Sequence, residues 1–91
     1  MNHAVIVEAI RSPMGRAKPD GSLAEVHPVD LLSQVLEQLI RKTGIDPGSV
    51  DDVICGCVSQ AGEQAGTPGR LAWLAAGLPL HVPSTTIDRK C

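Results

Sequence analysis

The chain has 91 residues, a mass of 9.5 kDa and a formal net charge of −2, from eight basic and ten acidic residues. Without a basic field, and with Trp73 as its only aromatic ring, it is a poor candidate for nucleic-acid binding. An apolar fraction of 43% argues against a disordered tail, and no apolar run approaches the ~20 residues of a membrane span.

The first predicted element is a strand over residues 4–10. Its sequence, AVIVEAI, is β-branched and apolar except for Glu8, which is typical of a strand covered on both faces. The N-terminus lacks the basic region of a signal peptide. Residues 11–15 (RSPMG) end the strand, and the stretch from there to about Val26 is typical of a loop.

The clearest predicted element is a helix that begins at Pro28. Proline suits the first helical turn, Asp30 there favours the helix dipole, and Gly44 is a typical residue after a helix end. Apolar side chains recur at spacings of three and four and predict one buried face: Leu32, Val35, Leu36, Leu39 and Ile40. Residues 46–48 (DPG) then predict a turn.

Two more strands and a second helix follow. Residues 53–58 (VICGCV) predict a buried strand, and residues 59–69 a loop. Thr67 and Pro68 match an N-cap followed by proline at the first helical position. We expect that helix to end at Gly77 and Pro79, and residues 84–88 to form a third strand. Its predicted apolar face consists of Leu71, Leu74, Ala75 and Leu78.

The predicted order of elements is βαβαβ, which implies an α/β fold with a largely parallel sheet. A parallel sheet needs helices on both faces, and two helices cannot cover three strands twice over. We therefore expect a portion of an α/β domain that is incomplete as given.

Two groups of residues resemble binding sites but fit a structural role better. Cys55 and Cys57 lie on one face of a predicted strand, but a metal would need two more ligands, so we interpret them as core residues. We expect no metal site. Gly62, Gly66 and Gly69 lack the spacing of a nucleotide-binding loop, and we interpret them as a tight strand-to-helix connection.

The histidines suggest no catalytic pair. We expect surface or capping roles for all three, and we nominate no general base: His3, His27 and His81. An odd number of cysteines at no zinc-finger spacing favours a reduced, cytoplasmic chain.

Cys91 is the candidate nucleophile. It directly follows the third predicted strand, and a helix beginning there would favour the thiolate through its exposed N–H groups and dipole. A thiolate on such a turn attacks carbonyl carbons, and its backbone N–H is a candidate oxyanion donor.

Almost the whole chain resembles the N-terminal part of the thiolases, the family of acetyl-CoA acetyltransferases and 3-ketoacyl-CoA thiolases. VIVEAIRSPMG resembles the opening strand and its R-[ST]-P-x-G ending. Residues 27–64 resemble the first helix, second strand and following loop, and residues 69–91 the second helix, third strand and nucleophile turn. The GEQ, AWLAAGLP and DRKC segments are most similar to actinobacterial thiolases of the fatty-acid or steroid side-chain type.

The resemblance implies that residues 1–91 are the N-terminal part of a thiolase-like layered α/β/α domain, with Cys91 carrying the acyl group as a thioester. Coenzyme A and acyl-CoA would be substrates, no cofactor would be bound permanently, and the enzyme would be a cytoplasmic homodimer or homotetramer of lipid metabolism. The family's other catalytic motifs, a histidine in G-H-P, an asparagine in N-E-A-F and a cysteine in C-x-G, do not occur here. We therefore expect the 91 residues to be inactive without the remainder of the enzyme.

Two alternatives remain. One is a related condensing enzyme, of the ketoacyl synthase or hydroxymethylglutaryl-CoA synthase type, which would share the fold and the cysteine. The other is a non-enzymatic α/β interaction module that completes its sheet on a partner, for which replacing Cys91 by serine would have no effect.

Overall fold

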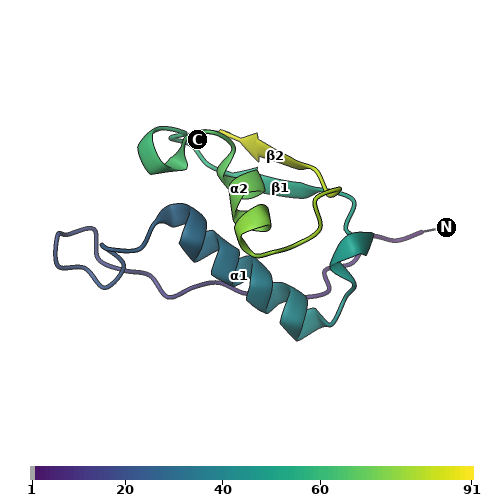
Figure 1. Cartoon of the computed structure of the whole chain (residues 1–91). Coiled ribbons are helices and arrows are strands. Elements are labelled where there is room, and N and C mark those ends of the chain that lie inside the picture. The colour runs from purple at the N-terminus through teal and green to yellow at the C-terminus, as the bar shows by residue number, and fades with distance from the viewer. Residues whose placement is uncertain (1) are drawn as a thin grey trace.

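The computed structural model describes residues 2–91. It contains two α-helices, two short 3-10 helices and a parallel sheet of two strands (Figure 1). Their order is α1 (Pro28–Thr43), η1 (Pro47–Ser49), β1 (Val53–Gly56), η2 (Gly62–Gln64), α2 (Pro68–Ala75) and β2 (Ser84–Ile87). Within residues 2–91, no helix has the length and apolar character required to cross a membrane.

Helix α1 begins and ends where its local signals predict. His27 is the N-cap, and its Nδ1 accepts a hydrogen bond from the Val29 backbone N–H at 3.1 Å, which satisfies one of the free donors of the first turn. Gly44 ends the helix with φ of 68°, a left-handed conformation that glycine adopts without steric cost. The expected capping role of His27 is confirmed.

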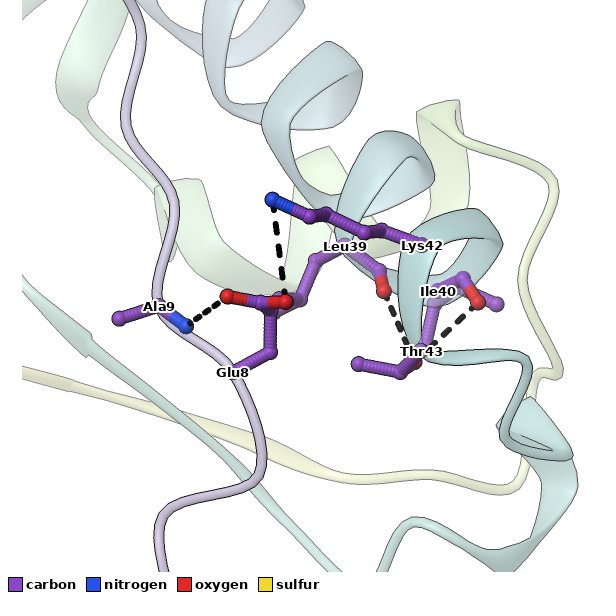
Figure 2. A network of polar contacts seen from close by, with 6 residues as sticks. All are labelled: Glu8, Ala9, Leu39, Ile40, Lys42 and Thr43. Carbon is purple, nitrogen blue, oxygen red and sulfur yellow. Dashed lines mark hydrogen bonds and ion pairs between the residues drawn. The ribbon is translucent and has the colours of Figure 1, made fainter.

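The predicted strand over residues 4–10 is wrong. The segment is extended but belongs to no strand, and Val5, Ile6 and Val7 are 77%, 89% and 71% exposed. A strand exists only through hydrogen bonds to a neighbouring strand, whereas this segment lies along α1. Figure 2 shows a polar contact between the two: Glu8 Oε2 pairs with Lys42 Nζ at 3.7 Å, and Glu8 Oε1 accepts from the Ala9 N–H at 3.0 Å.

The two strands pair in parallel, as the alternation of strands and helices predicts. Val53 lies opposite Ser84 and Gly56 opposite Ile87 in the register. Hydrogen bonds extend the pairing at both ends, from the Val53 N–H to the Pro83 carbonyl at 3.0 Å and from the Cys57 N–H to the Ile87 carbonyl at 2.9 Å. The sheet therefore has two strands where the sequence predicts three.

The face of helix α2 that packs against the core is not the face that its leucines predict. Its buried residues are Pro68, Gly69, Ala72 and Trp73, while Leu71 is 43% exposed. Small residues on the buried side let the helix approach the sheet closely. The single aromatic ring, Trp73, lies at the centre of the core with Ala72 and Val82, and these three are 2%, 0% and 0% exposed.

Only one face of the sheet is covered. Helix α2 packs on it, and α1 packs on the far side of α2 (Figure 1). The covered face carries Cys55 and Thr86, whereas on the other face Ile54 is 68% and Ile87 44% exposed. The prediction of a buried strand over residues 53–58 is therefore wrong for one face, because among residues 2–91 no helix packs against it. What is observed is a portion of an α/β fold.

Candidate active site

The candidate nucleophile lies at the carboxyl edge of the sheet. Both strands are parallel, so the loop after β1 and the stretch after β2 leave the sheet at the same edge. Cys91 lies four residues beyond the end of β2 and its side chain is exposed. This places a thiol at the edge of a parallel α/β sheet where ligands typically bind.

The loop from β1 to α2 is held by the side chain of Gln64 in η2. Its Nε2 donates to the Ser59 carbonyl at 2.8 Å and contacts Cys57 Sγ at 3.5 Å. Gly62 and Gly66 have φ of 58° and 71°, so the loop needs glycine there for its turns. The interpretation as a tight connection agrees with this geometry for Gly62 and Gly66, whereas Gly69 lies within α2. Gln64 is not among the predicted site residues, because a polar side chain alone gives no signal of this role.

The Cys55 thiol faces α2 beneath Gly69. A Cβ built on Gly69 would come within 2.5 Å of Cys55 Cβ and 3.0 Å of Ser84 Oγ, so only glycine permits this approach of helix and sheet. Burial, and to a smaller extent the charge of Cys57, raises the pKa of the Cys55 thiol above its ordinary value of 9.0. A thiol that resists ionisation is a poor nucleophile, which supports a core role for Cys55.

Thr67 is the N-cap of α2, as predicted, but not with the predicted chemistry. Its φ of 61° and ψ of 68° are left-handed, and its side chain forms no capping hydrogen bond. The hydroxyl donates instead to the Gly66 carbonyl. A β-branched residue is strained in this conformation.

Helix α2 also holds the connection that leads to β2. Trp73 Nε1 donates to the Pro79 carbonyl at 2.8 Å. Arg70 donates from Nη1 to the Val82 carbonyl at 2.6 Å and from Nη2 to the Leu80 carbonyl at 2.9 Å. Arg70 is not among the predicted site residues. Its one signal is that it is the only charged residue in PGRLAWLA, an otherwise apolar helix.

The remaining candidate residues do not gather around Cys91. The exposed His81 contacts the Gly48 carbonyl through Nε2 at 2.9 Å, at the start of the sheet, and His3 is exposed. Over residues 2–91 no group of three or more histidine, cysteine or acidic side chains is arranged to hold a metal ion.

A cleft of about 360 Å³ lies away from Cys91, between the N-terminal segment and α1. It is lined mainly by apolar side chains, among them Ile6, Leu39, Ile40 and Trp73. Its polar members include Glu8, Thr43 and Asp52. The cleft and the candidate nucleophile are therefore separate features.

Known proteins place this arrangement in one family. Residues 4–91 match the family described as thiolase, N-terminal domain. The chain is 50% identical over 91 residues to a steroid 3-ketoacyl-CoA thiolase of Mycobacterium tuberculosis and 48% identical over 92 residues to a β-ketoadipyl-CoA thiolase of Acinetobacter baylyi. Each alignment covers 100% of this chain and 22% of the relative, so the chain spans 22% of their length.

A solved structure is also similar to this chain in fold and sequence. The crystal structure of the Bacillus anthracis acetyl-CoA acetyltransferase matches with a TM-score of 0.64 and 40% sequence identity, over 74% of this chain and 17% of that one. A family match across residues 4–91, relatives at this level of identity and a shared fold agree. The chain belongs to the thiolase family.

Proposed function

We propose that the chain carries the nucleophile of a thiolase-type acyltransferase, which moves acyl groups to or from coenzyme A through an acyl-cysteine at Cys91. The observation that carries the proposal is the position of this thiol. It lies four residues beyond the end of β2, on the carboxyl side of the parallel sheet, in a chain that matches the thiolase N-terminal domain over residues 4–91.

The proposed reaction uses Cys91 twice. In thiolysis its thiolate attacks the 3-keto carbonyl carbon of a 3-ketoacyl-CoA, a C–S bond forms, and the bond between C2 and C3 breaks. Acetyl-CoA leaves as an enolate that takes up a proton. The thiolate of a free coenzyme A then attacks the acyl-cysteine, releases the shortened acyl-CoA and regenerates the Cys91 thiolate.

The reverse direction uses the same intermediate. Acetyl-CoA acylates Cys91 and coenzyme A leaves with a proton. A second acetyl-CoA loses a proton from its methyl group, and its carbanion attacks the acyl-cysteine to form acetoacetyl-CoA. The names of the relatives support 3-ketoacyl-CoA thioesters as the substrate class.

Residues 1–91 supply the nucleophile, its own backbone N–H as an oxyanion donor, and the strand that holds both. The family's histidine, asparagine and second cysteine motifs are absent from this sequence. We therefore propose that the 91 residues are inactive by themselves and that activity requires the remainder of a thiolase. We propose a homodimer or homotetramer for the whole enzyme, in the cytoplasm.

The test is acylation of the protein translated from its complete open reading frame. We expect acetyl-CoA to add one acetyl group, located at Cys91 by peptide mass spectrometry. Cys91→Ser lowers the rate of thiolysis at least about 1,000-fold, because serine is a far weaker nucleophile without a paired base. Cys57→Ser, a cysteine of the same chain in the loop after β1, serves as the matched control and keeps most of the activity.

Two results contradict the proposal. One is an acetyl group on Cys55 or Cys57 with Cys91 unmodified. The other is full activity of Cys91→Ser, which would favour an interaction module instead. Thiolysis by the purified 91-residue chain would contradict the narrower claim that it is inactive alone.

A further inference from the structure

Helix α2 controls the course of the connection from residue 76 to residue 83. Three of its side-chain donors reach carbonyls of this connection: Trp73 reaches Pro79, and Arg70 reaches both Leu80 and Val82 at 2.9 and 2.6 Å. The guanidinium is a planar fork, so its two hydrogen bonds fix two carbonyls relative to each other and to the helix.

The charge of Arg70 serves no ion pair among residues 2–91. The two ion pairs found there are Arg41–Glu37 and Lys42–Glu8. Arg70 is half-buried, and two of its guanidinium nitrogens donate to backbone carbonyls. Partial burial of an unpaired cation is unfavourable unless its donors are satisfied. Its use here is therefore geometric: it fixes where the connection enters the sheet.

The entry point determines where β2 lies along its axis. Val82 is 0% exposed and stands two residues before β2. The next residue, Pro83, accepts the first hydrogen bond of the ladder from Val53, and Ile87 accepts the last from Cys57. A displacement at Val82 that these hydrogen bonds do not absorb shifts β2, and with it the stretch that ends at Cys91.

We propose that Arg70 is a positioning residue for Cys91, acting through the start of β2. This inference rests on the proposed function, in which Cys91 is the acyl acceptor. A nucleophile displaced by about 1 Å from its productive position loses up to about 100-fold in rate. Arg70 therefore affects the rate of acylation more than the binding of acyl-CoA.

The test compares Arg70→Gln, Arg70→Lys and Arg41→Gln in the protein translated from its complete open reading frame. Arg41 is the matched control, an exposed arginine of α1 that pairs with Glu37 away from the sheet. Rapid quenching and mass spectrometry measure acetyl-Cys91 formation over a range of acetyl-CoA concentrations. The temperature is one at which circular dichroism shows each variant fully folded.

We expect Arg70→Gln to lower the maximal acylation rate about 10- to 100-fold, with the half-saturating acetyl-CoA concentration changed less than about twofold. Arg70→Lys keeps the charge without the fork and recovers part of the rate, and Arg41→Gln matches the wild type. A folded Arg70→Gln with the wild-type rate overturns the inference, because the residue then only stabilises. If Arg70→Gln does not fold, a wild-type rate in folded Arg70→Lys overturns it equally.

The wild-type protein tests the proposed function separately from the inference about Arg70. If acetyl-CoA leaves Cys91 of the wild type unmodified, both proposals fail. If the wild type is acetylated at Cys91 and the Arg70 variants behave like it, only the inference about Arg70 fails.

Discussion

Gly69 gives the sharpest test of how α2 meets the sheet. Its replacement by alanine would place a Cβ 2.5 Å from Cys55 Cβ and 3.0 Å from Ser84 Oγ. Cβ atoms in proteins essentially never come closer than 3.0 Å to a heavy atom outside their own residue and its chain neighbours. Ordinary van der Waals contact begins at 3.4 Å. Cys55 Cβ is fixed to the backbone of β1, so it cannot rotate away, and helix and strand must separate.

The size of the effect follows from two opposing contributions. Inserting a methyl group into a tight contact costs about 1–3 kcal/mol. Alanine is a better helix former than glycine, and this difference stabilises the folded state by up to about 1 kcal/mol. We therefore expect Gly69→Ala to destabilise the contact between α2 and the sheet by about 1–2 kcal/mol, which corresponds to a factor of about 5–30 in the local opening equilibrium.

Native-state hydrogen exchange measures that opening directly. We expect amides of β1 and β2 to exchange about 5- to 30-fold faster in Gly69→Ala than in the unmodified protein. Gly56→Ala is the control, because a Cβ at Gly56 meets nothing within 4 Å, and it leaves exchange unchanged or slower. Unchanged exchange in Gly69→Ala would refute the steric reasoning, since it would mean that the helix has room to spare.

Two further predictions concern the neighbourhood of α2. Thr67 holds a left-handed conformation with φ of 61°, so Thr67→Asn, which tolerates it better, raises the free energy of unfolding by about 1 kcal/mol, and a lower thermal midpoint would contradict this. Burial raises the pKa of the Cys55 thiol above 9.0, so the folded state holds that proton more tightly than the unfolded state. This contribution to stability is complete below about pH 9 and declines as the pH rises above it. The urea midpoint therefore falls on alkaline titration, and it falls less in Cys55→Ala; an equal fall in both proteins would exclude Cys55 as the source.

The ends of α1 could be predicted from the sequence because they depend on a few adjacent residues. A proline in the first turn and a glycine after the last are local signals, and the structure begins the helix at Pro28 and ends it before Gly44. Strands β1 and β2 were also predicted, with small errors at their ends. Their β-branched composition and the helix between them specified a parallel pair.

Features that depend on distant residues were predicted less well. The composition of residues 4–10 favours a strand, but composition does not supply the neighbour to which a strand must bond, and the segment follows α1 instead. The leucines of α2 do not identify its buried face, because Leu71 is exposed and Ala72 and Trp73 are buried. The close approach of Gly69 to Cys55 decides which side of α2 faces the sheet. The spacing of apolar residues in the sequence does not indicate this approach.

The candidate site could be predicted only in part. The position of Cys91 after a strand is visible in the sequence, whereas Cys55 and Cys57, predicted as core residues, are only partly buried. The role of Arg70 is not visible in the sequence, because its partners are backbone carbonyls and every residue has a backbone carbonyl. Backbone acceptors leave no trace in the amino-acid sequence, so a side chain that recognises them is found only once the chain is folded.

The long-range pairing of β1 with β2 has a consequence for synthesis. Leu36, Leu39 and Ile40 of α1 line the cleft, and the core beside them closes only when Val82 and β2 are present. The ribosome adds about 5–20 residues per second, so the 44 residues between Thr43 and the end of β2 at Ile87 take about 2–9 s. For those seconds only the N-terminal segment is available to cover the apolar stripe of the nascent helix. We expect this stripe to be a binding site for chaperones that act on emerging chains.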